Sequence, residues 1–373
     1  MHVLIACGGT GGHLFPGIAV GEVLKARGHE VTLLISEKKI DGLAASGHSD
    51  LRFEKMPFLA LPKLTLPQVF PFSLRFLSGL RACRKLIQTQ KVDVVLGMGG
   101  FTSTAPVIAG RWAKCRTYIH DSNALPGKAN RLTARFSDVV LLGFKEAASY
   151  FPKNDCRVVG TPVRASLRAA ARQTKEDPFQ FFGLKRDRKT LLVVGGSQGA
   201  RGVNENVGRS LDVLDAQGWQ ILHITGPGDY QMTRDYYHGK PISIYSHVAA
   251  FCQRMELAYL CADVAIARSG ASTLAELALF GVPSVLVPYP QAADDHQTKN
   301  AEVFEKADAA VIMQQKDLNP EKLASTLAGI VGLRGKNRTP AMKAAARKLA
   351  HERAAEEIAS ILEKPLKPKV KGT

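Results

Sequence analysis

Three glycine-rich turns each follow a short apolar run, and they are the first candidates for chemistry. They are Cys7–His13 (CGGTGGH), Gly97–Phe101 (GMGGF) and Gly195–Arg201 (GGSQGAR). Such a turn exposes backbone N–H groups at the start of a helix, and an anion can approach them because no Cβ atom is in the way. The first turn lacks the G-x-G-x-x-G spacing of a dinucleotide fingerprint and the Lys-Ser/Thr ending of a Walker loop. A tight turn without a ligand is the alternative, but the three together favour anion-binding loops.

A fourth candidate is Arg268–Glu276 (RSGASTLAE), which follows the apolar run 263–267. Its Ser-Gly pair would present N–H groups at a helix N-terminus to a phosphate. Glu276 lies just under two helical turns after Ser269, so it can sit near the same end of the helix and accept ribose hydroxyls. The alternative is a solvated helix carboxylate, but the leucines around Glu276 argue against it.

Polar residues are also dense at Asp294–Asn300 (DDHQTKN), where a later helix is expected to begin. Helix capping explains Asp294 or Asp295. It does not explain His296 and Gln297, which therefore stay candidates for a binding role.

Short apolar runs alternate with amphipathic stretches along most of the chain, as in β-α-β units that build a parallel sheet. In the first half we predict strands at 2–7, 30–35, 51–55, 93–96, 116–119 and 138–142. In the second half we predict strands at 190–194, 220–224, 242–245, 263–267, 284–287 and 310–313. A helix is expected at Pro16–Arg27, with Gly28 as its stop. The pattern therefore predicts an α/β fold of two Rossmann-like parallel-sheet lobes, with glycine turns of both lobes lining a cleft.

The domain limits follow from changes in composition. We predict a first lobe at 1–160, a second lobe at 161–338, a C-terminal helix at 339–363 that packs back towards the first lobe, and a basic disordered tail at 364–373. The stretch 164–188 is charged and helix-prone and contains Pro178, so the lobes are expected to connect at it or just before it.

The chain has 373 residues, which suits two domains of common size. Lys+Arg number 50 against 33 for Asp+Glu, and the net charge of +17 would attract nucleic acid, anionic lipid or phosphorylated substrates. Six separated cysteines predict free thiols in a reducing compartment. We see no secretory leader and no apolar run near the ~20 residues of a membrane span. This predicts a soluble cytoplasmic protein and leaves contact with a membrane surface open.

The segment Leu66–Leu77 (LPQVFPFSLRFL) is unusually aromatic for a connection, and basic residues follow it. An apolar patch beside a basic rim is how a monotopic protein docks on anionic lipid. Core packing of a helix at 73–88 is the alternative, and we expect both, with Leu74 and Leu77 partly inward and the phenylalanines partly outward. The predicted membrane patch comprises Phe70, Phe72, Phe76, Arg75, Arg81, Arg84, Lys85 and Trp112.

Seven segments follow one another in a characteristic order: GGTGGH (8–13), GMGGF (97–101), IHDSN (119–123), GTPVR (160–164), GGSQGAR (195–201), ADVAIARSGASTLAE (262–276) and VPYPQAADDHQTKNA (287–301). In order and spacing they resemble the MurG family of peptidoglycan N-acetylglucosaminyltransferases, in glycosyltransferase family 28. The resemblance covers nearly the whole chain. It implies the GT-B fold and an inverting transfer of GlcNAc from UDP-GlcNAc to the 4-hydroxyl of MurNAc-pentapeptide on undecaprenyl diphosphate, which converts lipid I into lipid II. It also implies no cofactor and no obligatory metal.

The resemblance implies that the first lobe binds the acceptor and the membrane, and that the second binds UDP-GlcNAc. Glu276 would hold the ribose, the backbone near Cys252 would meet the uracil, and Arg164 would add charge at the diphosphate. Gln297 and His296 would read the GlcNAc hydroxyls. The implied donor-binding residues are Thr10, Gly11, Gly12, Asn123, Arg164, Ser197, Cys252, Ser269, Gly270, Ala271, Ser272, Thr273, Leu274, Ala275, Glu276, His296 and Gln297.

His13 is the candidate base that takes the proton of the acceptor hydroxyl, because an imidazole titrates in the useful range. A structural role at the helix start is the alternative. The family commonly has His-Glu-Gln-Asn where this chain has His120–Asn123 (HDSN), so the shorter Asp121 puts a catalytic role of that acid in doubt. Asp121 is the main rival base.

Other functions stay open from the sequence. A UDP-GlcNAc 2-epimerase shares the two-lobe fold but would need its own acid/base carboxylates near the sugar. Sugar transfer to diacylglycerol or a sterol would need a different acceptor. The charge would suit a nucleic-acid-binding protein, but no RNA or DNA module or stacking platform is visible. We therefore expect UDP-GlcNAc, lipid I and an anionic membrane surface as partners, no nucleic acid, and a peripheral place on the cytoplasmic face of the cell membrane.

Overall fold

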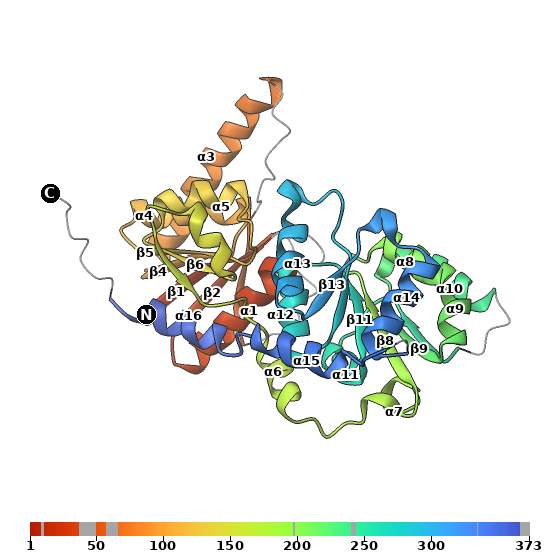
Figure 1. Cartoon of the computed structure of the whole chain (residues 1–373). Coiled ribbons are helices and arrows are strands. Elements are labelled where there is room, and N and C mark those ends of the chain that lie inside the picture. The colour runs from red at the N-terminus through yellow and green to blue at the C-terminus, as the bar shows by residue number, and fades with distance from the viewer. Residues whose placement is uncertain are drawn as a thin grey trace. The chain divides into compact units, whose positions relative to one another are not determined.

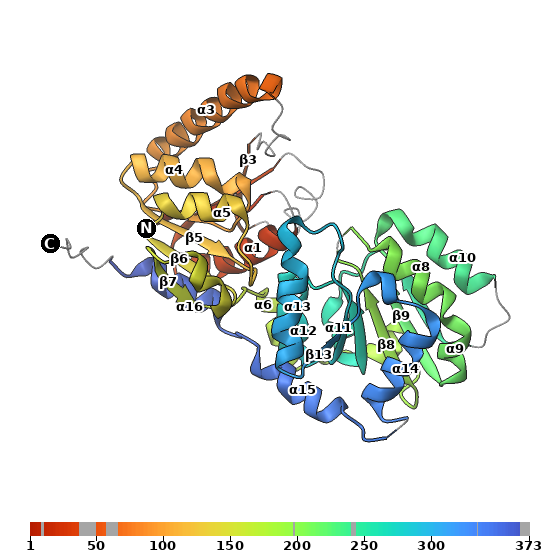
Figure 2. The same cartoon turned by 45° about the horizontal axis from the view of Figure 1, so that its top comes forward.

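The structure is a computed structural model that describes residues 1–8, 11–36, 50–56, 66–196, 198–239, 244–333 and 335–365, of which 66–71 as backbone only. The chain divides into two compact units. Unit 1 comprises Met1–Ala165 and His351–Thr373, and unit 2 comprises Ser166–Ala350. Each unit has one parallel sheet with helices on both faces (Figures 1 and 2). This confirms the predicted fold class.

The sheet of unit 1 has seven parallel strands in the order β3-β2-β1-β4-β5-β6-β7. Their bounds are β1 His2–Ala6, β2 Glu30–Ile35, β3 Arg52–Lys55, β4 Val94–Gly97, β5 Arg116–Asp121, β6 Val139–Leu142 and β7 Asp155–Val158. All of β1 is buried, as its unbroken apolar run requires in a sheet covered on both faces. Val3 and Ile5 join the core on one face, whereas Leu4 and Ala6 join the core on the other.

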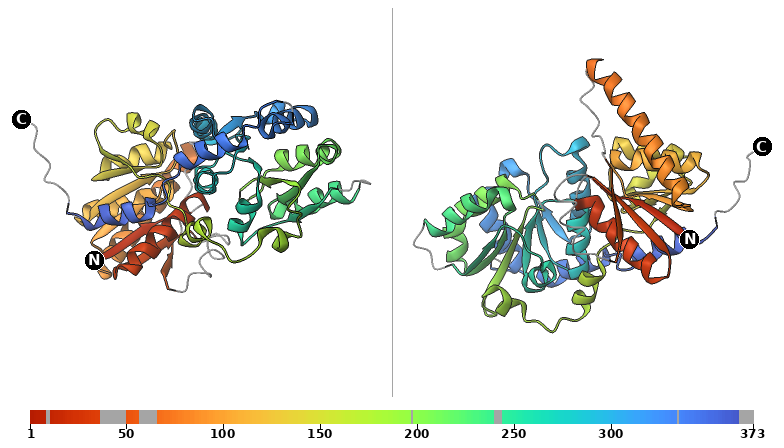
Figure 3. Two further views of the ribbon diagram at one scale, coloured as in Figure 1. Left: turned by 60° about the horizontal axis from the view of Figure 1, so that its bottom comes forward. Right: turned by 180° about the vertical axis from the view of Figure 1, so that it is seen from behind.

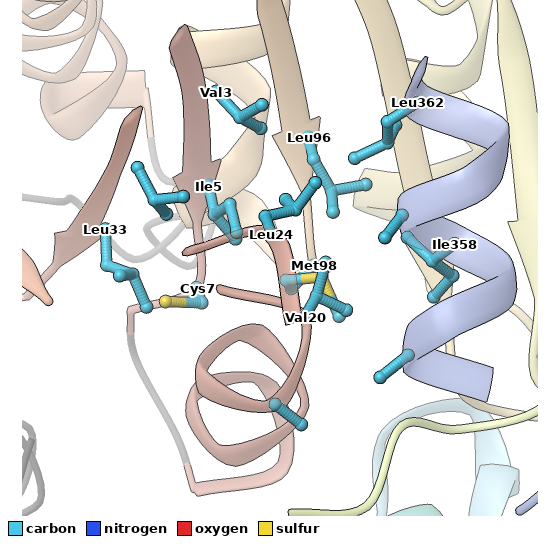
Figure 4. Packing of buried hydrophobic residues seen from close by; sticks show 14 of the residues in the cluster. Val3, Ile5, Cys7, Val20, Leu24, Leu33, Leu96, Met98, Ile358 and Leu362 are labelled. Atoms are coloured by element: carbon cyan, nitrogen blue, oxygen red, sulfur yellow. The ribbon is translucent and has the colours of Figure 1, made fainter. Parts of the chain in front are cut away.

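The helices of unit 1 form one layer on each face of this sheet. On one face lie α1 (Gly11–Ala26) and α16 (Ala354–Glu363), and Figure 4 shows Ile358 and Leu362 of α16 directed at the core around β4. The other face is covered by α3 (Leu66–Thr89) and α4 (Thr104–Trp112), and α3 projects beyond the sheet (Figure 3). The remaining elements are α5 Lys128–Thr133 and the 3-10 helices η1 Phe101–Ser103, η2 Ala134–Phe136 and η3 Lys145–Tyr150.

Polar contacts hold α16 in unit 1. Arg27 donates to the carboxylate of Glu363 at 2.8 Å, and His29 lies 2.9 Å from the same carboxylate. Arg116 donates to the carbonyl oxygens of Leu362 and Lys364 at 2.7 and 2.8 Å. The last helix is therefore fixed by hydrogen bonds as well as by its apolar face.

The sheet of unit 2 has six parallel strands in the order β10-β9-β8-β11-β12-β13. Their bounds are β8 Lys189–Val194, β9 Trp219–Ile224, β10 Ser246–Ala249, β11 Val264–Ala267, β12 Ser284–Leu286 and β13 Ala310–Ile312. The helices are α6 Ala165–Arg172, α7 Pro178–Phe182, α8 Arg201–Arg209, α9 Leu211–Ala216, α10 Tyr230–His238, α11 Met255–Cys261, α12 Ala271–Phe280, α13 His296–Lys306, α14 Pro320–Val331 and α15 Thr339–Lys348. Three 3-10 helices complete the unit: η4 Pro227–Asp229, η5 Ala293–Asp295 and η6 Gln315–Asp317.

Each sheet reverses its strand order at one place, between β1 and β4 in unit 1 and between β8 and β11 in unit 2. Open α/β sheets bind ligands outside the carboxyl ends of their strands at such a switch point. The four turns singled out in the sequence follow these four strands. The topology therefore brings the candidate turns together in two pairs, one in each unit.

The structure differs from the sequence prediction in several elements. The stretch 339–363 forms two helices, with α15 in unit 2 and α16 in unit 1. Residues 349–353 separate the two helices, and His351 there packs so tightly on Gly160 that a Cβ on the glycine would not fit. The units divide at 165/166 rather than at 160/161. Helix α1 begins at Gly11, and Pro16 lies inside it.

Two strands were also misjudged. Strand β7 was not predicted, and β10 was predicted at 242–245 but lies at Ser246–Ala249. Both are outer strands of their sheets, and they consist of exposed and half-buried residues instead of a buried apolar run. All six cysteines are free, as expected. Among the described residues no helix combines the length and the apolar character needed to cross a membrane.

Candidate active site

In unit 2, the turn after β8 meets the turn after β9 at backbone distance. A Cβ on Gly199 would overlap the carbonyl oxygen of Thr225, and a Cβ on Gly226 would overlap Gly199. Both glycines have positive φ, +77° and +82°. The side-chain amide of Asn204 stabilises this contact by donating to the Thr225 carbonyl and to the Asp229 carboxylate, both at 2.9 Å. The glycine turn is thus fixed by close backbone packing.

The turn after β11 ends in an open helix N-terminus. Ser269 is fully buried, and its hydroxyl has no hydrogen-bond partner among the residues described. Gly270 caps α12 without a side-chain hydrogen bond, and a Cβ built there would have no described residue within 4 Å. The first N–H groups of a helix need partners from outside it, and the helix dipole makes this end positive. A buried hydroxyl without a partner is costly, so this end of α12 has the features of an anion site.

Arg268 places a buried positive charge directly before this helix end. The residue is only 7% exposed. Its guanidinium donates to the carbonyl oxygens of Val287 and Pro288, both at 3.0 Å, and to the Gln315 side chain at 2.6 Å. No carboxylate is among its contacts within the described part of the chain, and burial lowers the pKa of the guanidinium from its ordinary value. A buried cation without a counter-charge is unfavourable, which fits a site that an anionic ligand completes.

Gln315 connects Arg268 to the glycine turn of the same unit. It lies against Gly202 in the first turn of α8, where a Cβ would come within 2.7 Å of its amide carbon. Asn300 of α13 donates to the Ser269 carbonyl at 3.1 Å. Polar side chains of Arg268, Gln315 and Asn300 therefore hold the turns after β8 and β11.

Glu276 lies on the second turn of α12 and is half-buried. The hydroxyl of Tyr259, from α11, donates to its Oε2 at 2.7 Å. The structure thus places Glu276 on the same helix as the open N-terminus, as the sequence suggested. Tyr259 was not singled out from the sequence, because an aromatic residue in an apolar helix is normally core.

The candidates on α13 are held at its first turn. The backbone N–H of Tyr289 donates to Oε1 of Gln297 at 2.9 Å. His296 Nδ1 lies 2.7 Å from a carbonyl oxygen in η5, so this nitrogen carries a proton and donates to that oxygen. The orientations of both side chains are therefore set by backbone contacts.

Cys252 is buried, and burial raises the pKa of its thiol. Its neighbour Phe251 is 59% exposed. An exposed aromatic ring beside the residue expected near uracil is a candidate for stacking on a base. The sequence alone did not reveal that Phe251 is exposed, because a phenylalanine in a sequence is usually expected in the core. Ser197, expected to meet the diphosphate, lies outside the described residues.

In unit 1, the turns after β1 and β4 are tied to each other. A Cβ on Gly8 would overlap the backbone nitrogen of Ser36 at the end of β2. Thr102 donates through its hydroxyl to the Gly8 carbonyl at 2.7 Å, and the Ser103 hydroxyl lies 3.1 Å from the Ala6 carbonyl. These hydrogen bonds fix the turn after β4 against the end of β1 and the residue Gly8 that follows it.

His13 lies in the first turn of α1, and its half-buried ring packs on the glycine pair of the second turn. A Cβ on Gly99 would lie 3.1 Å from Nε2 of His13, and a Cβ on Gly100 would lie 2.9 Å from Cε1. Both glycines have positive φ, +112° and +72°. Any other residue there would be strained and would collide with the imidazole. Gly11 and Gly12 open the same helix, and Thr10 lies outside the described residues.

Asp121 is 1% exposed and holds the loop that leads into α5. Its carboxylate accepts from the N–H groups of Asn123 and Gly127 at 2.8 and 3.3 Å and from the Asn130 amide at 2.7 Å. Burial outweighs these hydrogen bonds and raises its pKa to about 6. That pKa would suit a base, but both oxygens are engaged in the loop, so the geometry favours a structural carboxylate.

His120 is fully buried beside it. Its Nε2 lies 2.9 Å from the Gly160 carbonyl oxygen and therefore carries the proton, and its Nδ1 lies 3.3 Å from the Ser122 hydroxyl. Burial lowers its pKa to about 4, so it is neutral at physiological pH. His120 and Ser122 therefore form a structural pair.

Arg164 lies in unit 1, with its guanidinium 4.8 Å over the Phe15 ring of α1. Its Nε is buried and has no hydrogen-bond partner within the described chain. Asn123 follows Asp121 and is half-buried. Arg164 thus packs on helix α1, and Asn123 lies two residues after the end of β5.

On α3 the inward and outward sides are the reverse of the expectation. Phe72 and Phe76 are half-buried and form a ring cluster with Phe101, with centroids 5.6 to 6.2 Å apart. Leu74 and Leu77 are 53% and 46% exposed. The reason is helical phase, since the buried stripe continues from Phe76 to Leu80, Cys83 and Ile87. The side chain of Phe70 lies outside the described part.

The outward side of α3 is strongly basic. Arg75, Arg81, Arg84 and Lys85 are exposed, and Trp112 at the end of the neighbouring α4 is 55% exposed. Asp93 is the single acidic residue between Glu54 and Asp121. This face therefore combines exposed apolar side chains with a positive surface.

The four turns at two switch points, with an open helix end and a buried cation in unit 2, define a two-domain α/β protein of the GT-B class. Within the described residues, no group of three or more His, Cys, Asp or Glu is placed to hold a metal ion.

Comparison with known proteins agrees with this class. Residues 3–142 match the glycosyltransferase family 28 N-terminal domain, and residues 190–358 match the glycosyltransferase family 28 C-terminal domain. The chain is 32% identical, over 96% of its length and 98% of the relative, to the UDP-N-acetylglucosamine--N-acetylmuramyl-(pentapeptide) pyrophosphoryl-undecaprenol N-acetylglucosamine transferase of Halalkalibacterium halodurans. The chain belongs to the MurG-type glycosyltransferases of family 28.

Solved structures share the fold. Acinetobacter baumannii MurG superposes with a TM-score of 0.74 at 26% identity, over 98% of this chain and 99% of that one. A Listeria monocytogenes protein assigned as a UDP-N-acetylglucosamine 2-epimerase superposes with a TM-score of 0.70 at 14% identity, over 99% and 98%. The second likeness is one of fold alone.

Proposed function

We propose that the protein transfers GlcNAc from UDP-GlcNAc to the 4-hydroxyl of MurNAc-pentapeptide on undecaprenyl diphosphate, with inversion at C1, forming lipid II for peptidoglycan synthesis. The family to which the chain belongs supports the reaction. The observation that carries the assignment to this chain is the open end of α12. There, within the part of the chain that the structure describes, the buried Ser269 hydroxyl has no hydrogen-bond partner and the buried Arg268 has no carboxylate contact. An anion site of this kind suits the diphosphate of a nucleotide sugar.

Unit 2 would hold the donor. The diphosphate would lie at the N–H groups that open α12, the ribose at Glu276, and the uracil at Cys252 with its base against Phe251. Gln297 and His296 would contact the GlcNAc hydroxyls. As the C1–O bond to the diphosphate breaks, negative charge grows on UDP, and the helix end and Arg268 would stabilise it. We therefore propose a reaction without cofactor or obligatory metal.

Unit 1 would act on the acceptor. In the transfer, the acceptor oxygen forms a bond to C1, the bond from C1 to UDP breaks, and a base takes the proton of the hydroxyl. We propose His13 as this base, since its ring is held by the Gly99–Gly100 turn and is half-exposed. Asp121 is buried, and its oxygens accept three hydrogen bonds from its own loop.

The direct test incubates the full chain with UDP-GlcNAc and a short-chain lipid I analogue. We expect one UDP released for each disaccharide formed, with the new bond of inverted configuration. UDP release that does not depend on the acceptor, or disaccharide formation equally fast with a diacylglycerol acceptor, would contradict the proposal.

The epimerase alternative has its own test. An epimerase would convert UDP-GlcNAc to UDP-ManNAc without any acceptor. We expect UDP-GlcNAc to remain unchanged in an incubation without acceptor. Nuclear magnetic resonance of the sugar H1 signal would measure this.

We further propose that the protein works as a peripheral protein on the cytoplasmic face of the cell membrane, where its lipid-linked acceptor resides. The support is the outward side of α3, with Leu74, Leu77 and Trp112 exposed among basic side chains and with few acids nearby. An apolar patch beside a basic rim suits anionic lipid.

A further inference from the structure

The contact between Tyr259 and Glu276 extends the donor site by one residue. Tyr259 of α11 is 3% exposed, and its ring lies 5.1 Å from the ring of Phe280 in α12, centroid to centroid, so the ring is buried against the neighbouring helix. Its hydroxyl donates to the Oε2 of Glu276 at 2.7 Å. A rigid aromatic body thus presents one donor at a fixed position.

Glu276 depends on such a donor for its orientation. A glutamate side chain on a helix has several rotamers and loses about 1.5–2 kcal/mol of entropy when fixed. A hydrogen bond to an ionised carboxylate is about twice as strong as one between neutral groups. A carboxylate has about four lone-pair positions, and the Tyr259 hydroxyl occupies one of those of Glu276.

We propose that Tyr259 is a positioning residue that orients Glu276 for the ribose hydroxyls, and so sets the preference of the enzyme for ribonucleotide over deoxyribonucleotide donors. The inference rests on the proposed function, in which Glu276 holds the ribose. Tyr259 itself does not touch the nucleotide. Its effect is to hold the carboxylate in the binding orientation before the donor arrives, so that the donor does not have to order it.

The test compares two ligands on the full-length protein by calorimetry, UDP and 2′-deoxy-UDP. In the unaltered protein, loss of one hydrogen-bonded hydroxyl should weaken binding by ~10-fold. Tyr259→Phe removes only the phenol oxygen, and water can reach the half-buried carboxylate in its place, so the variant should fold. We expect the deoxy penalty to fall to ~3-fold in this variant. In transfer assays the KM for UDP-GlcNAc should rise with kcat unchanged.

Two further variants make the result specific. Glu276→Asp withdraws the carboxylate from Tyr259 and should lower the deoxy penalty in the same way. Tyr237→Phe is the matched control, because its hydroxyl also contacts a buried side chain of unit 2, His223 at 3.0 Å. It should leave the deoxy penalty at its original value.

The outcomes separate the two claims. If Glu276→Ala abolishes the deoxy penalty while Tyr259→Phe leaves it intact, Tyr259 is only a brace between helices and this inference is overturned, but the ribose role of Glu276 stands. If Glu276→Ala also leaves the penalty intact, Glu276 does not read the ribose, and that part of the proposed function falls with the inference. Weaker binding of both ligands by one factor in Tyr259→Phe would likewise indicate a purely structural role.

Discussion

The two pairs of turns occupy the same place in their sheets but differ in what surrounds them. In unit 1, the His13 ring covers the glycine pair at 99–100, and both carboxylate oxygens of Asp121 accept hydrogen bonds from the loop that follows it. In unit 2, no described residue is a partner of the Ser269 hydroxyl or lies within 4 Å of a Cβ built on Gly270. Within the described residues, the glycine pair of unit 1 is thus covered by a side chain, whereas the N-terminus of α12 in unit 2 is open.

This difference indicates how two similar sheets divide the chemistry. An open helix end with the buried Arg268 before it offers fixed positive potential, which suits a ligand that carries charge throughout the reaction. A filled turn that presents one imidazole suits proton transfer, for which a single group must be held in place. The predictions below test whether this division holds.

The largest effect should come from His13→Ala. If His13 is the base, kcat should fall by ~10²–10⁴ with little change in UDP-GlcNAc affinity, and the acidic limb of the pH–rate profile should disappear. His29→Ala is a suitable control, since His29 follows the other end of α1 and contacts Glu363. A near-normal kcat for His13→Ala, together with a large loss for Asp121→Ala, would transfer the role to the carboxylate.

Next is Arg268→Gln, which removes the buried cation of unit 2. Its effect should scale with ligand charge, so UDP should bind ~10–100-fold more weakly, corresponding to about 1.5–3 kcal/mol, while uridine should be nearly unaffected. Ser269→Ala should give a smaller loss in the same direction. Calorimetry with UDP, UMP and uridine measures the series. An equal loss for all three ligands would mean that Arg268 serves only to hold the loops together.

A comparable but salt-dependent effect is expected on membrane binding. Each basic residue near an anionic surface contributes about 1 kcal/mol, so Arg81→Ala with Arg84→Ala should lower partition into anionic vesicles by ~30-fold. Co-sedimentation at low salt measures it. Arg209→Ala with Lys306→Ala removes the same charge from exposed positions of unit 2 and is the control. Equal loss in both double variants would show that net charge, and not α3, governs binding.

The smallest effect concerns Asp121 and stability. Its pKa is raised from 3.8 to about 6 in the folded protein, so its contribution to stability is full below the unfolded value and is lost as pH rises through about 6. The unfolding free energy of the unaltered protein, relative to Asp121→Asn, should therefore fall between about pH 4 and about pH 6. Urea unfolding at several pH values gives this difference. A difference that does not change with pH would mean that burial does not govern this carboxylate.

Much of the fold could be predicted because buried parallel strands have unbroken apolar runs in the sequence, as β1 does. The outer strands β7 and β10 could not, since a strand with neighbours on one side only has no need of such a run. The break between α15 and α16 could not be predicted from the sequence either. It depends on the packing of His351 on Gly160, between residues far apart in the sequence.

The turns could be predicted because glycine and serine directly after an apolar strand are typical of anion-binding turns. Glu276 could be predicted from its spacing to one of these turns. The groups that hold them could not. Arg268, Gln315 and Tyr259 act through contacts across different loops, and each is an ordinary residue in its own segment. The inward side of α3 was misjudged because Phe72, Phe76 and their neighbours are apolar on both sides of the helix, so composition did not fix its phase.

The division of labour between the two units is tested most directly by hydrogen exchange of the full-length protein with and without UDP. The account predicts slower exchange of the amides at 269–276, with little change at 11–26 and 99–104, because UDP alone carries no sugar for unit 1 to contact. Slower exchange confined to 11–26 and 99–104, with 269–276 unchanged, would contradict the assignment of the donor diphosphate to the open end of α12.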